Sequence, residues 1–212
     1  PLIYNPIPVL SPLLLKGKNE LHSILGINVG AQLADHHRAY GQIALNGSNF
    51  NKLGFQLGYR GYNFFGLQDF MLQLEYNYVP SGLYKADYSR LNYTHYNMAL
   101  GHSRGEGFQE LLLRSNYEYK RVYLELSLSY YALENYDQLS LLPVILPSEN
   151  YNSETFDVLN SSLELGYRIN RRLNFTVFAA GILRGTTKLG SANTAFFNAG
   201  IRTDLNNHYS DF

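Results

Sequence analysis

The feature that most constrains the fold is a two-residue alternation of side chains along most of the chain. In Leu21–Leu33 the odd positions read Leu, Ser, Leu, Ile, Val, Ala and Leu, whereas the even positions read His, Ile, Gly, Asn, Gly and Gln. Successive side chains of a β-strand point to opposite faces, so this period predicts strands with one apolar face. The alternation recurs in eight further segments: Ala39–Leu45, Leu53–Gly61, Phe70–Tyr78, Leu111–Tyr119, Val122–Ala132, Leu159–Ile169, Leu173–Leu183 and Ala195–Thr203. No segment shows a helical period of 3.6, and the sequence predicts an all-β, antiparallel fold with about nine strands.

The two faces of these strands differ in charge. The apolar faces contain no Asp, Glu, Lys or Arg, although charged residues make up 16% of the chain. Acidic and basic residues occur in equal number on the opposite faces, as expected of an interior in which charges pair or meet water: Arg60, Glu75, Arg114, Glu118, Glu125, Glu164, Arg168 and Arg202. They indicate either a network along a wall or a polar conduit.

Two fold classes fit such alternation, a soluble β-sandwich and a transmembrane β-barrel. The strands exceed the usual five or six residues and approach the roughly 9–11 residues that cross a bilayer with tilt. The chain ends in Phe212, as many outer-membrane barrels end in an aromatic residue. Seven tyrosines lie on the apolar face near strand ends, where the aromatic girdles of barrels lie: Tyr59, Tyr76, Tyr78, Tyr117, Tyr119, Tyr130 and Tyr167. We therefore predict an antiparallel transmembrane β-barrel in the bacterial outer membrane.

Other classes of protein fit the composition poorly. The longest apolar stretch, residues 8–15, is interrupted by Pro12 and is shorter than the roughly 20 residues of a transmembrane helix. The absence of cysteine excludes disulfides, thiolate-bound metals and thiol nucleophiles. The formal net charge is zero, so the chain offers no excess of positive charge for nucleic acid.

Turn lengths predict how the barrel is oriented. The turns at residues 119–121 and 170–172 are short, as periplasmic turns are, and residues 62–69 lie on the same side. Residues 79–107 and 134–157 then form extracellular excursions, and Tyr93–Leu100 has room for a short hairpin. Counted this way the nine strands begin outside the cell, whereas barrels normally have an even strand number and periplasmic ends. Residues 1–212 contain no signal-peptide pattern, and we expect them to be a single barrel domain or the C-terminal part of a larger barrel.

Four segments together carry a family resemblance. They are Tyr40-Gly41-Gln42, the run from Lys52 to Gly58, the run from Leu72 to Asn77 and the run from Asn92 to His102. In order and spacing they resemble the capsule-assembly Wzi family of outer-membrane barrels, particularly the branch with gliding-motility barrels of the RemB type. The resemblance covers most of residues 20–130 and the ending Gly200–Asp204.

This resemblance implies a protein that anchors or assembles surface polysaccharide, acting like a lectin and not as an enzyme. It also implies a barrel of roughly eighteen strands, within the bacterial range, of which this chain resembles the C-terminal half. One segment departs from the family pattern: this chain has His102-Ser103-Arg104-Gly105-Glu106-Gly107-Phe108 where the family has His-Pro-Leu-Gly-Ala-Asn-Phe.

The candidate glycan-binding residues lie in the first excursion, which is rich in aromatic rings and amides. Pyranose rings bind to flat apolar faces, and their hydroxyls bind to amide or imidazole groups. The residues that offer both are Tyr88, Tyr93, His95, Tyr96, Asn97 and His102. The alternative is a folded loop or plug whose Tyr and Asn side chains satisfy one another.

Catalytic, metal and cofactor sites are not predicted. His36 and His37 point to opposite faces of a strand, and no His–carboxylate cluster has ligand spacing. Ser103 beside His102 lacks a third catalytic partner, and the chain has no Gly-x-Ser-x-Gly motif. The expected partners are surface polysaccharide, outer-membrane lipid and other outer-membrane or periplasmic proteins. The alternative function is that of a structural barrel subunit in a gliding or protein-secretion complex.

Overall fold

The computed structural model describes residues 24–46, 52–85, 92–95, 98–102, 104–136, 154–171, 173–188 and 190–203. All nine predicted strands are present and form one antiparallel sheet. They are β1 (Ile24–Ala34), β2 (His37–Asn46), β3 (Leu53–Tyr62), β4 (Phe70–Val79), β7 (Phe108–Tyr119), β8 (Val122–Tyr136), β9 (Glu154–Asn170), β10 (Phe175–Thr186) and β11 (Thr194–Arg202). Two short strands, β5 (Thr94–His95) and β6 (Met98–Ala99), form a separate hairpin.

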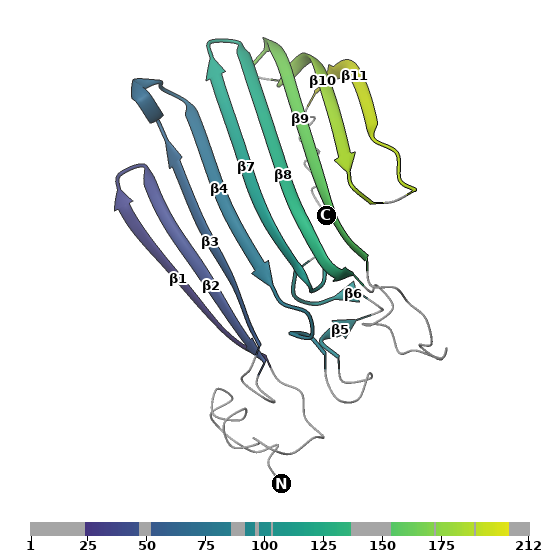
Figure 1. Ribbon diagram of the computed structural model, residues 1–212. Helices are drawn as coiled ribbons and strands as arrows, with labels where there is room; N and C mark the ends of the chain where they lie inside the picture. Colours follow the sequence, from purple (N-terminus) through teal and green to yellow (C-terminus); the bar gives the residue numbers. More distant parts are fainter. Residues whose placement is uncertain are drawn as a thin grey trace, which may run out of the picture.

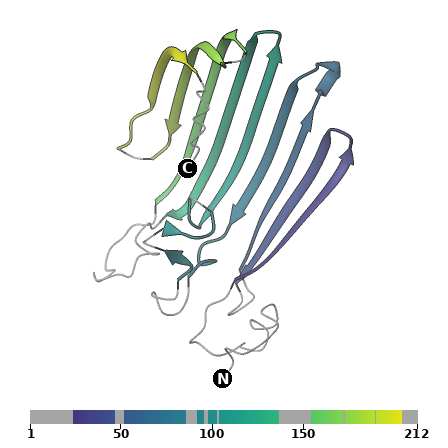
Figure 2. The same cartoon turned by 180° about the vertical axis from the view of Figure 1, so that it is seen from behind.

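The sheet is a simple meander in which each strand pairs with its neighbours in the chain, and β4 pairs with β7 across the β5–β6 hairpin. Figures 1 and 2 show the nine strands side by side in one twisted layer. Within the described residues the sheet is open, with β1 and β11 as its edges. The part of the chain that the structure describes contains no helix long and apolar enough to cross a membrane.

Short and long connections lie at opposite ends of the sheet (Figure 1). The four short turns are at residues 35–36, 63–69, 120–121 and 171–174. Three of them contain Asn63, Asp69, Lys120 and Asn174 in the left-handed backbone region, which Asn and Asp occupy more readily than most residues. The connection from β4 to β7 lies at the other end, which we call the long-connection end.

The strand register confirms the predicted phase of the alternation. One cross-strand row joins Leu57, Tyr76, Leu111, Tyr130 and Leu159, and its members are largely exposed, with Leu57 at 59% and Leu111 at 52%. The next row lies on the opposite side and joins Gln56, Asn77, Glu110, Tyr131 and Val158. The last four of these residues are buried. We call the two sides the apolar face and the polar face.

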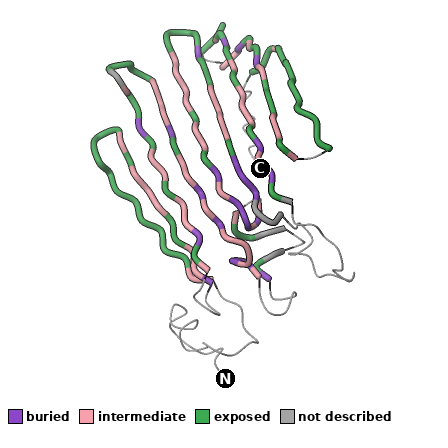
Figure 3. Tube along the Cα trace, viewed as in Figure 1, coloured by how far each residue is buried: buried purple, intermediate pink, exposed green. Residues whose placement is uncertain are grey.

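Burial thus differs from that of a soluble sheet, because large side chains of the apolar face are exposed while Gln73, Asn77 and Glu110 of the polar face are buried. A cluster of buried apolar residues lies on the polar face at the long-connection end, where Figure 3 shows buried residues on neighbouring strands. Residues from the β4–β7 connection pack there against strand residues: Val79, Leu83, Tyr84, Phe108, Tyr131, Leu133, Phe156 and Val158.

Tyrosine rings also lie across glycines of the neighbouring strand on the polar face. Tyr40 of β2 is opposite Gly58 of β3, and Tyr123 of β8 is opposite Gly166 of β9. A Cβ atom on either glycine would overlap the tyrosine ring. Each tyrosine hydroxyl then donates to a carboxylate, Tyr40 to Glu75 and Tyr123 to Glu164. These glycines are therefore required by close packing.

Gly58→Ala is expected to lower the free energy of unfolding by about 1–3 kcal/mol, because overpacking displaces the Tyr40 ring and its contact with Glu75. Gly181→Ala is the matched control, since a Cβ at Gly181 would have nothing within 4 Å. The control is expected to change stability by less than about 0.5 kcal/mol. Urea unfolding of the purified protein measures both, and equal effects would contradict the packing argument.

Candidate functional site

The segment between β4 and β7, residues 80–107, folds back over the polar face; we call it the excursion. It is described except for residues 86–91, 96–97 and 103. Leu83 is fully buried and lies against Gly54, where an added Cβ would approach its Cδ2 to 2.8 Å. The side-chain amide of Asn46 donates to the carbonyl oxygen of Leu83 at 3.2 Å. These contacts fix the first turn of the excursion to β2 and β3.

Tyr84 organises the middle of the excursion. Its backbone N–H donates to Glu106 Oε2 at 3.0 Å, and its carbonyl accepts from the Tyr93 N–H at 2.9 Å. Its hydroxyl accepts from the His102 backbone N–H at 3.2 Å, and its ring occupies the space that a side chain at Gly101 would need. Burial raises the pKa of Tyr84, and the nearby carboxylate of Glu106 adds to this rise. The phenol therefore stays neutral and acts as a structural acceptor.

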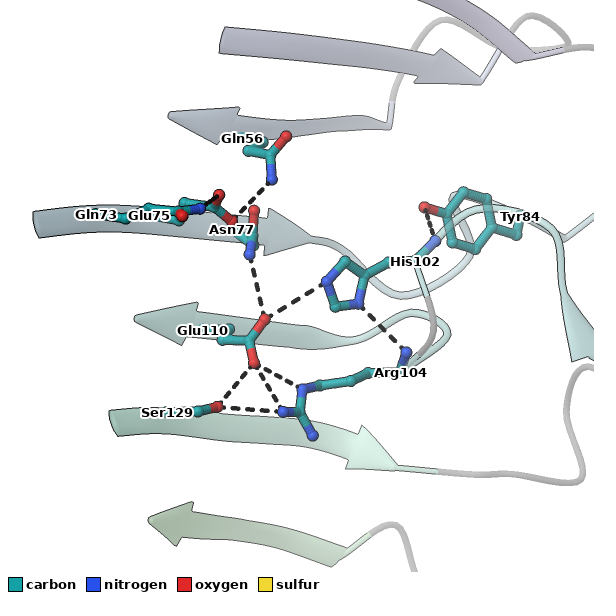
Figure 4. Close-up of polar contacts among 9 residues, drawn as sticks. All are labelled: Gln56, Gln73, Glu75, Asn77, Tyr84, His102, Arg104, Glu110 and Ser129. Carbon is teal, nitrogen blue, oxygen red and sulfur yellow. Dashed lines mark hydrogen bonds and ion pairs between the residues drawn. The ribbon is translucent and has the colours of Figure 1, made fainter. Parts of the chain in front are cut away.

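A buried carboxylate holds the end of the excursion on the sheet (Figure 4). Glu110 on β7 is 4% exposed. Its Oε1 accepts from Arg104 Nε and from Ser129 Oγ, both at 2.9 Å. Its Oε2 accepts from Asn77 Nδ2 at 3.2 Å and lies 3.5 Å from His102 Nε2. A buried charge is tolerated only with such partners, and here they come from the excursion and from the strands on either side, β4 and β8.

Aromatic rings complete this cluster. The Arg104 guanidinium carbon lies 3.6 Å from the centre of the Tyr131 ring, a cation–π contact. The His102 ring centre lies 4.6 Å from that of Phe108. Arg104 and His102 of the excursion thus each make two contacts, one with the Glu110 carboxylate and one with an aromatic ring of the core.

A hollow of about 330 Å³ lies between the polar face and the excursion. The rings of Tyr84 and Tyr93 border it with their centres 6.0 Å apart. Residues with side-chain amides border it from the strands: Gln42, Gln56 and Asn77. Flat aromatic faces beside convergent amides are what a neutral sugar ring needs, since the rings contact C–H groups and the amides bind hydroxyls.

The structure brings two of the six predicted glycan-binding residues to this hollow. Tyr93 borders it and is 40% exposed. His102 also borders it, but its ring contacts Glu110 and Phe108, as in the alternative interpretation of a folded loop. The backbone of His95 forms β5 opposite Met98. Tyr88, Tyr96 and Asn97 lie outside the described residues.

Several residues of the site were not singled out from the sequence. Gln56 and Asn77 are adjacent in register, as are Asn77 and Glu110. The alternation puts Gln56 and Asn77 on the polar face, whereas Glu110 lies just before the predicted strand Leu111–Tyr119, and β7 in fact begins at Phe108. Strand pairing and the correct start of β7 were the missing signals. Among the described residues, no three His, Asp or Glu side chains gather in a way that would hold a metal ion.

Only some of the charges on the polar face form ion pairs. Arg168 pairs with Glu118 and Arg202 with Glu164, each at 2.5 Å. Four charges of the predicted network have no oppositely charged partner within 4.0 Å among the described residues: Arg60, Glu75, Arg114 and Glu125. The wall is therefore only partly a network of paired charges.

Comparison of the chain with protein-family models, with curated proteins and with solved structures finds no match. The functional argument rests on the geometry of the sheet and the excursion.

Proposed function

We propose that this chain forms part of the wall of an outer-membrane β-barrel. We further propose that the hollow beneath its excursion binds surface polysaccharide, as a lectin does and without catalysis. The observation that carries the proposal is the exposed apolar face. It runs across all nine strands, with Val29, Leu57 and Phe197 exposed by 66%, 59% and 72%. Continuous apolar surface on this scale needs an apolar environment, and lipid supplies one.

The aromatic residues of the apolar face support lipid over a second protein sheet. The Phe55 ring contacts the rings of Tyr76 and Tyr78 toward the long-connection end. Phe70 and Tyr117 contact each other near the short turns. From Phe70 to Tyr78 along β4 is roughly 27 Å at about 3.4 Å per residue. With the strand tilt of about 35–45° found in outer-membrane barrels, this length covers roughly 20 Å of height, somewhat less than the apolar band of about 25 Å that their aromatic girdles flank.

The polysaccharide part of the proposal rests on the hollow and its position. The Tyr84 and Tyr93 rings and the amides of β2, β3 and β4 converge at the long-connection end. Under the barrel proposal this end faces the cell exterior, because outer-membrane barrels have their short turns in the periplasm. A ligand attached to the cell surface would therefore reach the hollow without crossing the membrane.

One observation favours the alternative, a structural barrel subunit of a gliding or protein-secretion complex. His102 and Arg104 are both occupied by Glu110, so part of the excursion serves to hold itself in place. A rigid excursion of this kind also suits a surface that docks another protein.

The combined change of Tyr93, Tyr96 and Asn97 to Ala tests the polysaccharide proposal. Loss of one stacking contact, worth about 1 kcal/mol, would weaken glycan binding roughly fivefold, and retention of glycan on cells should fall at least that much. Tyr62→Ala is the matched control, because Tyr62 is 46% exposed and ends β3 beside the short turns.

Glycan retention is measured by antibody staining, normalised to the amount of protein in the outer membrane. Normal assembly with unchanged retention would contradict a glycan site here. Normal retention together with loss of a co-purifying protein would favour the structural alternative.

A further inference from the structure

Three arginines of the polar face lie in one cross-strand row. Arg38 of β2 is opposite Arg60 of β3, Arg60 is opposite Gln73 of β4, and Gln73 is opposite Arg114 of β7. No carboxylate among the described residues lies within 4.0 Å of any of the three arginines. Like charges placed directly opposite one another destabilise a strand pair. The row is therefore a concentration of positive charge that the fold leaves without neutralisation.

A second hollow, of about 560 Å³, opens between the first two of these arginines. Arg38 reaches toward β1, where a Cβ added to Gly30 would come 3.0 Å from Arg38 Nη2. Arg60 reaches toward β4, where its Nε and Nη2 donate to Gln73 Oε1 at 3.1 and 2.5 Å. A guanidinium has five N–H donors, so both groups retain donors for a ligand.

Two groups that line this hollow, the Tyr40 ring and the Glu75 carboxylate, are held in place by neighbouring residues. The Tyr40 ring lies across Gly58 and lines the hollow. Glu75 accepts from the Tyr40 hydroxyl, from Gln73 Nε2 at 2.5 Å and from Gln56 Nε2 at 3.3 Å. The hydrogen-bond partners of the Glu75 carboxylate are thus neutral groups, two amides and a phenol, which it orients. Within the hollow, the one negative charge of Glu75 stands against the two positive charges of Arg38 and Arg60.

We propose that Arg38 and Arg60 form an anion-binding site for a carboxylate, sulfate or phosphate group. Guanidinium groups bind such oxyanions through paired, charge-assisted hydrogen bonds. The flat Tyr40 ring and the amides of Gln42 and Gln56 suit a sugar ring that carries the charge. A free inorganic anion would offer the same charged group without the ring. The site adjoins the hollow beneath the excursion, with which it shares Gln42 and Gln56, but its charged residues Arg38 and Arg60 do not line that hollow. The proposal does not depend on the function proposed for the excursion.

The test uses the purified protein in detergent and three probes: hexagalacturonate as an acidic saccharide, maltohexaose as a neutral one, and sodium sulfate. Calorimetry is expected to show hexagalacturonate binding that weakens as sodium chloride is raised. Arg38→Gln with Arg60→Gln should weaken this binding at least about tenfold, because two charge-assisted contacts are lost. Arg184→Gln should change it less than about twofold; Arg184 is a polar-face arginine of β10 opposite Asn160 and Thr194, remote from the hollow.

The relative affinities for the three probes identify the ligand class of the site. Tighter binding of hexagalacturonate than of sulfate supports the site with an acidic saccharide as its ligand, and equal binding supports it with a small anion. Absence of anion binding, binding of maltohexaose as tight as that of hexagalacturonate, or equal losses in the Arg38/Arg60 and Arg184 variants would overturn it. Arg38→Gln alone gives the same test if the double variant does not fold. The Tyr93, Tyr96 and Asn97 variant should bind hexagalacturonate normally, so failure of the excursion site is distinguishable.

Discussion

Under the barrel proposal, Leu163→Arg is expected to destabilise the membrane-inserted protein by about 2–4 kcal/mol, the cost of a lipid-facing arginine near the bilayer midplane. Leu163 lies in the middle of β9, is 49% exposed on the apolar face and pairs with Leu126 of β8. The guanidinium would there replace an apolar contact with lipid. Equilibrium unfolding from lipid vesicles in urea measures the change.

The neighbouring residue provides the control at the same depth. Ser162 lies on the polar face, opposite Ser127 and Ile182, and Glu164 follows it on that face. Ser162→Arg therefore places the same charge near an acid and is expected to cost less than about 1 kcal/mol. Equal losses at the two positions would show that the two faces do not meet different environments.

Glu110→Gln is expected to lower the free energy of unfolding by about 1.5–3 kcal/mol, because it removes the charge of a carboxylate that is 4% exposed and accepts a hydrogen bond from Arg104, whose side chain is 27% exposed. The excursion should then detach, so trypsin should cleave the folded protein after Lys85 much faster than in the wild type. Glu118→Gln is the control, since the Glu118–Arg168 pair is partly exposed, at 29% and 26%. Its loss should cost about 0–1 kcal/mol.

Urea unfolding and limited proteolysis give independent readings of this prediction. Rapid cleavage after Lys85 with little loss of global stability would show that the excursion unfolds locally. Similar stability and similar cleavage in both variants would contradict the role of Glu110 as the anchor.

The strands could be predicted from sequence because one face excludes charge almost completely. β4 was expected at Phe70–Tyr78 and is found at Phe70–Val79. The predicted strand ends are wrong where this alternation of apolar and polar positions is interrupted. β8 continues past Ala132 through a register shift between Leu133 and Tyr136, which interrupts the alternation. β9 begins at Glu154, although the predicted strand began at Leu159. The charge of Asp157 lies at an apolar-face position, so the charge-free alternation begins only after it.

The site was less predictable because its contacts join residues far apart in the chain. The aromatic and amide content of the excursion pointed to Tyr93 and His102, and both border the hollow. The return of the excursion onto the polar face depends on Glu110. The role of Glu110 becomes visible only when β4, β7 and β8 are aligned, because its partners Asn77 and Ser129 lie on the neighbouring strands. The same holds for Tyr40 and Gly58, whose packing follows from register and not from local sequence.

Single-cysteine scanning along residues 159–168 of β9, in membranes, tests most directly whether the apolar face meets lipid. The chain has no cysteine of its own, so each introduced thiol is read without background. Spin labels at the odd positions, such as Leu163 and Leu165, should be accessible to oxygen dissolved in lipid. Labels at the even positions, such as Ser162 and Glu164, should not be, and a period of two along the strand is the predicted result. Odd positions that are reached instead by a water-soluble relaxation agent would contradict the account.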